Sequence, residues 1–554
     1  MFVEDLKKEF YDVILHERVL ILVNNDTDAV CSAKILLSMF KCDNVSYTLI
    51  PVTGKKDMYT EYNNHSQGYK FVLLINCGVT LDLYEFLEPR DDVIIFVADY
   101  HRPVEVTNIY NDGQIRLLHP PDPEDQLPDY HDIFRDSESE ESDSEDEFGE
   151  KRRKFDESAL VKKRERREWE EKRQRILFTY TQYSFYGSST ALLCFKLAYM
   201  LKRDTNDLLW WSIVGNTEMY LSCKIEDDRY LLDASQQQNH VGRLNSTPAD
   251  QLPKESLKIN AERGLNLVLL RHWTLLDSIK HSSYTAMKFK LFSVKGERKL
   301  NDFLADLGIP LVESKQKYTY MDPQIRDEIP KVFEAKMDKY EIQEIFFNTF
   351  LCQFGYQHKY YAADVVRAVT ATLEHGDSTF DCKQAVYDAL DLLSRSNGKK
   401  LDAGIEKAKD QAQAVFKMAQ NILEPKQIVS LGPFLYCIIQ EGIPSISYLT
   451  KHNVVKTLAH FILQGHISNS RSKKAADLPL VLIAPLDQAA GLSVVVGIPP
   501  YNDKTRRNFF GKAFSQTVRN TQCRYLIDYW DSSLIQIKTE DKAKFIDGLI
   551  SLLS

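Results

Sequence analysis

Three short apolar runs near the start of the chain constrain its fold more than any other feature. The runs are RVLILV (Arg18–Val23), YKFVLLI (Tyr69–Ile75) and VIIFVA (Val93–Ala98). Continuous Val, Ile and Leu without alternating polar residues is typical of strands that are buried on both faces of a sheet. A helical pattern over Ala29–Phe40 follows the first run, and this alternation of strand and helix predicts a doubly wound, parallel sheet.

Polar side chains follow each of these predicted strands. Asp26 and Asp28 come after the first strand, Asn76 after the second, and Asp99 and His101 after the third. Because the carboxyl ends of parallel strands lie at one edge of a sheet, these side chains are expected to converge there. Carboxylates and imidazoles are ligands for Mn²⁺ or Mg²⁺, and two ions about 3.5–4 Å apart would activate water against a phosphoryl group.

The same residues also allow a structural interpretation. In that interpretation, Asp26 or Asp28 caps the helix that follows, and His101 is an ordinary loop residue. The spacing of the motifs alone does not decide between a metal site and structural roles.

The overall composition argues against several classes of protein. A net charge of −9 disfavours a main affinity for bare phosphate backbone, although a local nucleic-acid groove stays open. No apolar run approaches the ~18 residues of a membrane span, and the N-terminal MFVEDLKKEF lacks the pattern of a signal peptide. Nine dispersed cysteines with no CxxC pair favour reduced, mostly buried thiols over a zinc ribbon. We therefore expect a soluble, intracellular protein.

The composition changes abruptly after residue 134. RDSESEESDSEDEFGE (135–150) is almost entirely acidic residues and serine, so we expect it to be disordered. The following stretch mixes both charges, which predicts an exposed helix with i,i+4 ion pairs. The alternative for this stretch is a nuclear import signal. Its residues would be Lys151, Arg152, Arg153, Lys154, Lys162, Lys163 and Arg164.

The predicted fold is α/β and divides into five segments. They are 1–134, the first part of the α/β core; 135–175, the charged linker; 176–224, the continued core; 225–425, a mainly helical region; and 426–554, a second α/β domain. In the last segment, apolar runs predict neighbouring strands at Pro479–Pro485 and Leu492–Pro500, a helix over Arg506–Asn520 and a strand at Ser533–Lys538. Thr539 is expected to cap the closing helix.

The order of the polar motifs resembles that of the DHH phosphoesterase superfamily, which includes the RecJ nucleases. That family carries two aspartates after its first strand, an aspartate before Cys-Gly, an Asp-His-His motif and a further aspartate in a helix. The matching positions here are Asp26, Asp28, Asn76, Asp99, His101 and Glu218. The resemblance implies a DHH/RecJ-like parallel-sheet core.

Four departures from the family pattern put its chemistry in doubt. Asn76 replaces an aspartate and loses a negative charge, and Tyr100 replaces a histidine with a phenol that is a poor ligand at neutral pH. Glu218 replaces an aspartate, and Ala29 a glycine. We therefore expect a vestigial site with no metal, no cofactor and no catalytic residue, in which the remaining acids need a substitute partner such as Lys34 or Arg102.

A second resemblance spans the whole chain. The stretches that carry it are DIFRD (132–136), REW (167–169), WWSIVG (210–215), SYTAMKFKLFSVKG (283–296), FLADLGIPL (303–311), FGYQHKYYAADVVRA (354–368), SRSN (394–397), GPFLYC (432–437), VVGIPP (495–500), NFFGKAF (508–514) and KFIDGLISLLS (544–554). Their order is similar to that in the cell division cycle 45 family, the RecJ-like subunits of the eukaryotic replicative helicase. That resemblance implies a helical insertion and a C-terminal DHHA1-like α/β domain. NFFGKAF offers only Gly511 where active RecJ-like proteins carry a glycine-rich GGH-type motif for holding nucleic acid.

The resemblance implies a nuclear, non-catalytic scaffold in DNA replication. Such a subunit joins the MCM ring and the GINS complex into the CMG helicase for origin firing and fork progression, with single-stranded DNA as a further candidate ligand. It also implies no membrane and no small-molecule substrate. The acidic run then gains candidate phosphorylation sites at Ser137, Ser142 and Ser144, although a solvated spacer is an equal alternative.

Two other functions stay open. One is a residual manganese-dependent phosphoesterase or nuclease that uses Asp26, Asp28, Asp99 and His101, and the other is an acidic nuclear adapter that binds basic partners through residues 135–150. A related choice concerns MKFKLFSVKGERK (287–299), whose lysines and phenylalanines fit either a single-strand groove or an amphipathic core element. We favour the core element.

Overall fold

A parallel sheet forms the centre of the first lobe, as the apolar runs predict. The computed structural model describes residues 1–122, 125–135, 157–245, 257–355, 358–376, 381–440, 446–470 and 473–554. The sheet has the order β2-β1-β3-β4-β6, with every neighbouring pair parallel. Its strands are β1 (Arg18–Asn24), β2 (Ser46–Val52), β3 (Phe71–Ile75), β4 (Ile94–Ala98) and β6 (Ile115–Leu117). The predicted α/β class is confirmed, while β2 and β6 are additions that the sequence pattern does not predict.

Helices cover both faces of this sheet. They are α2 (Thr27–Asp43), α3 (Lys55–His65), α4 (Leu83–Leu87), α8 (Thr190–Met200), α9 (Asn206–Leu221) and α10 (Asp227–Asn245). Successive β1 residues pack on opposite faces: Ile21 joins the core with α2, and Leu22 joins the core with α3 and α4. This arrangement explains why the strand is apolar at every position.

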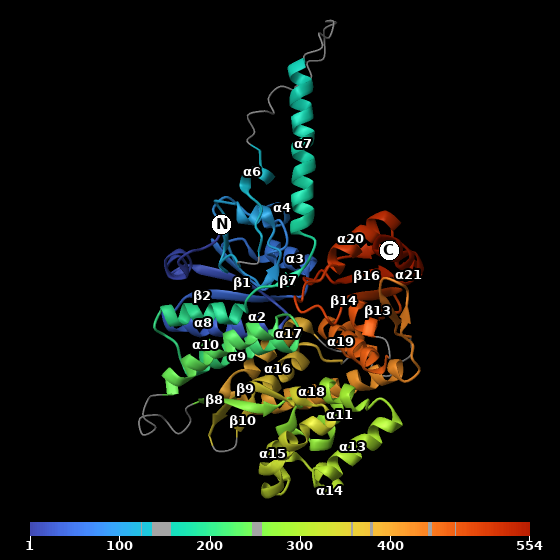
Figure 1. Ribbon diagram of the computed structural model, residues 1–554. Helices are drawn as coiled ribbons and strands as arrows, with labels where there is room; N and C mark the ends of the chain where they lie inside the picture. Colours follow the sequence, from blue (N-terminus) through green and yellow to red (C-terminus); the bar gives the residue numbers. More distant parts are fainter. Residues whose placement is uncertain are drawn as a thin grey trace.

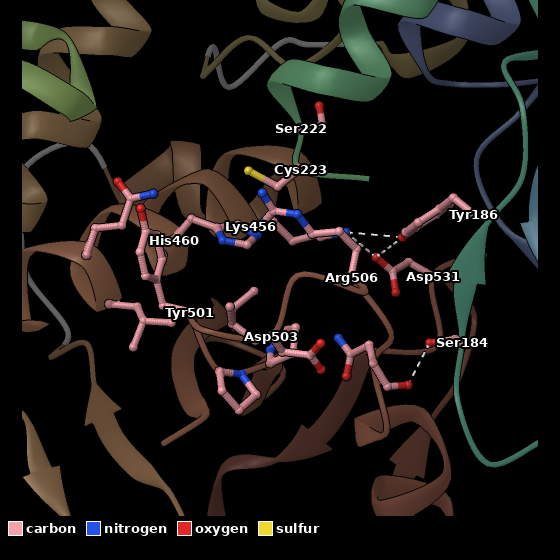
Figure 2. Close-up of a pocket in the computed structure, with 16 residues that line it drawn as sticks. Ser184, Tyr186, Ser222, Cys223, Lys456, His460, Tyr501, Asp503, Arg506 and Asp531 are labelled. Carbon is pink, nitrogen blue, oxygen red and sulfur yellow. Dashed lines mark hydrogen bonds and ion pairs between the residues drawn. The ribbon is translucent and has the colours of Figure 1, made fainter. Parts of the chain in front are cut away.

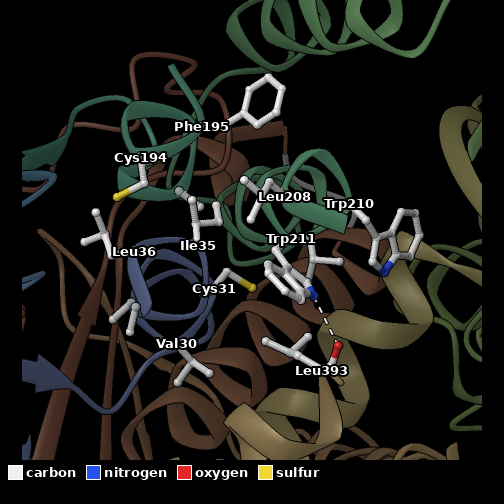
Figure 3. Packing of buried hydrophobic residues seen from close by; sticks show 14 of the residues in the cluster. Val30, Cys31, Ile35, Leu36, Cys194, Phe195, Leu208, Trp210, Trp211 and Leu393 are labelled. Atoms are coloured by element: carbon white, nitrogen blue, oxygen red, sulfur yellow. Dashed lines mark hydrogen bonds between the residues drawn. The ribbon is translucent and has the colours of Figure 1, made fainter. Parts of the chain in front are cut away.

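The helical layer behind α2 is held by large buried side chains. Figure 3 shows Val30, Cys31 and Ile35 of α2 facing the apolar side chains of α8 and α9. Trp211 of α9 is buried in this layer, and its indole nitrogen donates a hydrogen bond of 3.1 Å to the carbonyl of Leu393. The indole N–H of a buried tryptophan usually donates a hydrogen bond in this way.

The middle of the chain combines helices with a small sheet. The helices are α11 (Leu275–His281), α12 (Ser283–Phe289), α13 (Val294–Asp306), α14 (Leu311–Ser314), α15 (Pro323–Tyr340), α16 (Ala362–Leu373), α17 (Cys382–Leu392) and α18 (Gly398–Leu423). The sheet is antiparallel, in the order β10-β9-β8, and its strands are β8 (Lys258–Leu265), β9 (Phe346–Phe354) and β10 (His358–Tyr361). The prediction of a mainly helical region misses this sheet.

The segment 287–299 belongs to the core of this middle region. Phe289 and Phe292 are each 3% exposed and pack in one cluster with Phe303 of α13. The favoured prediction of an amphipathic core element is confirmed. The single-strand groove is wrong for these phenylalanines, because a stacking platform needs its rings at the surface.

A six-stranded sheet forms the C-terminal lobe, beside the first lobe (Figure 1). Its order is β11-β12-β13-β14-β16-β15, and only the β12/β13 pair is parallel. The strands are β11 (Val429–Ser430), β12 (Leu435–Ile438), β13 (Leu480–Asp487), β14 (Leu492–Ile498), β15 (Tyr525–Leu526) and β16 (Leu534–Lys538), and the helices are α19 (His452–Asn469), α20 (Phe510–Thr521) and α21 (Lys542–Leu553). The predicted neighbouring strands are β13 and β14.

Two predictions at the C-terminus need correction. The helix expected from Arg506 begins at Phe510, four residues later. Thr539 does not cap the closing helix: its hydroxyl lies 3.0 Å from that of Ser493, and α21 begins after Asp541. Because the Thr539 hydroxyl is hydrogen-bonded to Ser493, it is not available to cap the helix.

The charged stretch after the acidic run forms α7 (Glu157–Tyr180), which projects from the body of the molecule (Figure 1). Arg164 and Arg166 donate to glutamates four residues on, at 2.8 and 3.0 Å, so the predicted exposed helix with i,i+4 pairs is confirmed. Three groups of predicted residues are not placed: Ser137, Ser142, Ser144 and Lys151–Lys154 lie outside the described residues, and Lys162 and Lys163 lie in α7 without described side chains.

Two further sequence expectations concern membranes and thiols. None of the helices in the described ranges combines the length and apolarity that a membrane crossing needs. All nine cysteines are free thiols, and six of them are buried, as predicted.

Candidate functional site

Three of the predicted side chains meet at the carboxyl edge of the first sheet. The amide nitrogen of Asn76 donates to Asp26 Oδ1 at 3.1 Å and to Asp28 Oδ2 at 3.0 Å. All three residues are buried. The predicted convergence is therefore observed for Asp26, Asp28 and Asn76, whereas Asp99 and His101 form a separate pair.

Asp26 has the structural role that the second interpretation gave it. Its side chain accepts a 2.8 Å hydrogen bond from the backbone N–H of Ala29 and so caps α2. The side-chain amide of Asn24 donates to its other oxygen at 2.7 Å. Burial raises the pKa of Asp26 to about 7, with Lys224 acting against this shift and Glu218 and Asp28 adding to it.

The side chain of Asp28 contacts the N-terminus of α8 and does not cap α2, the helix to which Asp28 belongs. Its carboxylate accepts hydrogen bonds from the backbone N–H of Thr190 at 2.9 Å, the N–H of Ala191 at 3.2 Å and the hydroxyl of Ser189 at 2.5 Å. The N–H groups and dipole of a helix N-terminus stabilise an anion there. Gly215 of α9 permits this approach, because a Cβ at that position would lie 2.6 Å from Asp28 Oδ1.

The asparagine that departs from the family pattern is oriented by its neighbours. Thr190 Oγ1 donates to Asn76 Oδ1 at 2.5 Å, which turns the amide NH₂ group toward the two aspartates. An aspartate at this position would face Asp26 and Asp28 with a third carboxylate. The substitution therefore supplies hydrogen-bond donors where the family pattern supplies a negative charge.

Asp99 and His101 form a separate pair at the end of β4. His101 Nδ1 lies 2.6 Å from Asp99 Oδ1, and the backbone N–H groups of His101 and Val79 also donate to this carboxylate, at 3.0 and 3.2 Å. Burial alone would raise the pKa of Asp99, but the charge and hydrogen bonds of His101 lower it overall. Asp99 is therefore held as a carboxylate by its own loop.

A lysine that the sequence did not single out supplies the positive charge of the site. Lys224 Nζ lies 3.0 Å from Glu218 Oε1 and 2.9 Å from the hydroxyl of Tyr100, and the lysine and glutamate side chains are only 6% and 5% exposed. Burial would lower the pKa of Lys224, but Glu218 and Asp26 raise it overall. Lys224 is therefore an ammonium ion among these acids.

The two substitute partners named from the sequence are wrong. Lys34 Nζ instead binds the carbonyl of Leu390 and the hydroxyl of Ser394, at 2.8 and 2.6 Å. Arg102 forms a buried ion pair with Asp125 at 3.1 Å. Lys224 lies six positions after Glu218, so that pairing is local in sequence, while its proximity to Asp26 depends on tertiary packing.

The tyrosine that replaces the first histidine of the motif belongs to the same cluster. Burial raises the pKa of Tyr100 well above its ordinary value, and Asp26 and Glu218 raise it further, so the phenol stays neutral as predicted. Lys224 Nζ also lies 4.8 Å from the centroid of the Tyr100 ring, within the range of a cation–π interaction.

These contacts do not fit a divalent cation at the predicted positions. A metal ligand must direct a free lone pair at the ion, whereas both carboxylates of the Asp26–Asp28 pair accept hydrogen bonds from protein N–H and O–H groups. Glu218 accepts from Lys224 and, at 2.7 Å, from Ser222. In the ranges that the structure describes, no three His, Cys, Asp or Glu side chains are grouped in a way that could hold a metal ion.

A narrow cleft of about 50 Å³ lies beside this cluster, between the first and C-terminal lobes. Figure 2 shows Lys456, Tyr186 and Asp531 meeting at its wall. The Tyr186 hydroxyl donates to Asp531 Oδ2 at 2.9 Å, and Lys456 forms an ion pair with the same carboxylate. The three side chains therefore join the two lobes.

Other contacts close the same boundary. The backbones of Ser184 and Asn508 exchange two hydrogen bonds of 2.8 Å. Within the C-terminal lobe, a Cβ on Gly511 of the NFFGKAF stretch would lie 2.3 Å from Ser532 Oγ, so this glycine permits close packing there. Burial, reinforced by Lys456, lowers the pKa of His460 to about 3, so this cleft residue is neutral. Because Ser184 and Asn508 are far apart in the chain, motif reasoning could not pair them.

Comparisons with known proteins agree along the whole chain. A family model described as CDC45 matches residues 19–150 and 124–552. The chain is 41% identical over 567 residues to the cell division control protein 45 homolog of Homo sapiens, with 100% of both chains covered. It is 26% identical to the homolog of Schizosaccharomyces pombe, with 96% of this chain and 95% of that protein covered. The crystal structure of CDC45 from Entamoeba histolytica matches with a TM-score of 0.72, 22% identity and full coverage of both chains.

Proposed function

The chain belongs to the CDC45 family, and from this premise we propose that it is a non-catalytic scaffold subunit of the replicative DNA helicase. The family gives it a role in DNA replication and the cell cycle. In the proposed role it joins the MCM ring to the GINS complex in the nucleus, for origin firing and fork progression. Single-stranded DNA is a further candidate ligand of the assembled complex.

The observation that carries the non-catalytic part of the proposal is the buried Lys224–Glu218 pair. An ammonium ion lies among the residues where a phosphoesterase of this superfamily would place divalent cations. A fixed ammonium balances negative charge but does not activate a water molecule as a metal ion does. Asn76 and Tyr100 add hydrogen-bonding groups suited to this arrangement.

The scaffold part of the proposal is supported by the extent of the family match. The identity of 41% covers the whole chain and the whole human relative, so every region, including the helical middle, has a counterpart. The projecting helix α7 and the three joined regions offer separate surfaces for several partners (Figure 1).

Reconstitution of the helicase tests the proposal. The purified chain is mixed with the MCM ring and GINS, and co-elution and DNA unwinding are measured with the chain, without it, and with the Asp26→Ala, Asp99→Ala variant. We expect the chain to be required for a stable assembly and for unwinding, and the variant to support both if it is folded. Assembly and unwinding at full level without the chain would reject the scaffold role.

A second arm of the same experiment separates the scaffold from the adapter. Deleting residues 135–150 removes the acidic run and leaves the described core intact. The scaffold role predicts that binding to MCM and GINS is retained. Loss of all partner binding would favour the adapter.

A further inference from the structure

A groove of about 540 Å³ lies between α8, α10 and the loop at residues 119–122, and it shares no lining residue with the cleft between the lobes. Its volume is in the range of ligand-binding pockets. Its apolar lining is Leu192, Leu193, Phe195, Pro120 and Pro121, and its polar lining includes Arg229, Asp233, Gln236 and Gln237 of α10. The groove thus combines an apolar surface from α8 with a polar face of α10.

Two hydrogen-bond acceptors in this groove lack donors. Gln237 is only 2% exposed; its amide nitrogen reaches Ser212 Oγ at 3.4 Å, but its Oε1 has no partner among the described residues. Asp233 Oδ2 is also buried, and it too has no partner in the part of the chain that the structure describes. The two residues are four positions apart on α10 and therefore lie on the same face of the helix.

The two arginines that line the groove have other partners, and its lysine, Lys196, is exposed to solvent. Arg229 Nη2 donates to Asp122 Oδ2 at 2.7 Å and to Ser188 Oγ at 2.9 Å. Arg102 is paired with Asp125. Burial, followed by the charge of Arg102, lowers the pKa of His119 to about 3, so this imidazole is neutral.

The environment of Asp233 agrees with a carboxylate that lacks a direct partner. Burial raises its pKa to about 6, and the charge of Arg229 offsets only part of that shift. A bound group that donates hydrogen bonds and carries positive charge would satisfy this carboxylate.

We propose that this groove binds an arginine side chain of a partner protein, with the guanidinium group donating to Asp233 Oδ2 and Gln237 Oε1. A guanidinium is planar and carries five N–H donors, so it can serve two acceptors on one helix face. Its aliphatic stem matches the apolar surface of Leu192 and Phe195. The groove is larger than one side chain, so the residues that flank the arginine occupy the remainder.

The chemistry of the groove favours arginine over other occupants. An anion would add negative charge beside Asp233 and leave both acceptors without donors. A lysine ammonium is a compact charge and lacks the planar fork.

Peptide binding to the full chain tests this proposal independently of helicase assembly. The probes are acetyl-Leu-Arg-Leu-amide and the same peptide with citrulline, which keeps the shape but removes the charge. Calorimetry or ligand-observed NMR measures both affinities. We expect the arginine peptide to bind and the citrulline peptide to bind at least tenfold more weakly.

Variants locate the binding to the groove. Asp233→Asn removes the charge with almost no change in shape, and Leu192→Trp fills the groove from α8. Each variant should bind the arginine peptide at least tenfold more weakly than the parent chain does. Asp228→Asn, an exposed aspartate on the same helix, is the matched control and should leave the affinity unchanged. Circular dichroism and thermal melting establish that each variant is folded.

The unpaired acceptor itself can be tested without a ligand. Gln237→Met removes the buried Oε1 and should raise the melting temperature of the free chain. The same variant should lower the affinity for the arginine peptide. The proposal is overturned by equal binding of the two peptides, by no binding of the arginine peptide, or by an effect of Asp228→Asn as large as that of Asp233→Asn.

Discussion

Lys224 Nζ lies 3.0 Å from Glu218 Oε1, with both side chains almost completely buried. Glu218 stands at a predicted metal-ligand position, and Asp26, another such position, raises the pKa of the lysine. The positive charge that this sheet edge needs is therefore part of the polypeptide. A buried pair of this kind depends on both members, because either one alone is an uncompensated charge.

Removing the lysine should destabilise the chain strongly. Lys224→Met leaves Glu218 and Asp26 without their cation, and such changes typically cost about 3–5 kcal/mol. Urea unfolding at pH 7.5 measures the loss of unfolding free energy. Lys202→Met, at an exposed lysine just after α8, should change it by less than about 0.5 kcal/mol.

A double-mutant cycle separates the ion pair from other effects of the substitution. Lys224→Met combined with Glu218→Met replaces both charges by apolar side chains and should recover most of the stability lost in Lys224→Met. Additive losses in the double variant would contradict the assignment of Lys224 as the partner of Glu218.

Asp26 should make the chain less stable as the pH rises. Its pKa is raised to about 7 in the folded chain, against about 3.9 in an unfolded chain. The folded state therefore holds this proton more tightly, so the contribution is fully present below about pH 4 and is lost as the pH rises to 7. Asp26→Asn keeps an N-cap and removes the titration.

The measurement for Asp26 is the stability difference between Asp26→Asn and the parent at several pH values. The free energy of unfolding of the variant, relative to that of the parent, should increase as the pH rises from 4 to 8. The increase should reach about 4 kcal/mol for a shift of three pKa units. A pH-independent difference would show that Asp26 does not titrate in this range.

Restoring the aspartate of the family pattern should harm this chain. Asn76→Asp removes the donors to Asp26 and Asp28 and places a third carboxylate beside them. We expect a loss of about 2 kcal/mol or more at pH 8 and a smaller loss at pH 5, where the added acid is more easily protonated. Thermal unfolding at both pH values measures this, and equal or greater stability at pH 8 would contradict the role given to Asn76.

The contact between the lobes should depend on one carboxylate. Asp531→Asn weakens the interactions with Lys456 and Tyr186 that join the lobes. Burial would raise the pKa of Asp531, but Lys456 and Ser533 hold it well below its ordinary value, so its stabilisation is present above about pH 4 and is lost as the solution becomes more acidic. Hydrogen exchange should rise on both sides of the cleft, while Asp503→Asn, a cleft aspartate whose carboxylate accepts from Thr505, serves as the control.

The first sheet could be predicted because its strands are buried on both faces and read as uninterrupted apolar runs. The meeting of Asp26, Asp28 and Asn76 followed from the rule that parallel strand ends share one edge. β8, β9 and β10 were missed because their burial alternates or is partial, which leaves a weak apolar signal.

The partners of the buried charges could not be predicted in the same way. Lys224 follows Glu218 by six positions, but only the packing of α9 against α2 brings it close to Asp26. Lys34 is nearer to Asp26 in sequence and Arg102 is nearer to Asp99, yet each has other partners. A sequence shows that buried acids need a cation, while the fold decides which cation reaches them.

Manganese titration of the purified parent chain tests the central claim most directly. Calorimetry with Mn²⁺ is run beside an assay for single-stranded DNA hydrolysis, with the Asp26→Ala, Asp99→Ala variant as the control. If Lys224 fills the cation position, the parent should show no saturable Mn²⁺ binding and no hydrolysis above the control. Stoichiometric Mn²⁺ binding together with hydrolysis that the control loses would contradict this account and identify a working phosphoesterase.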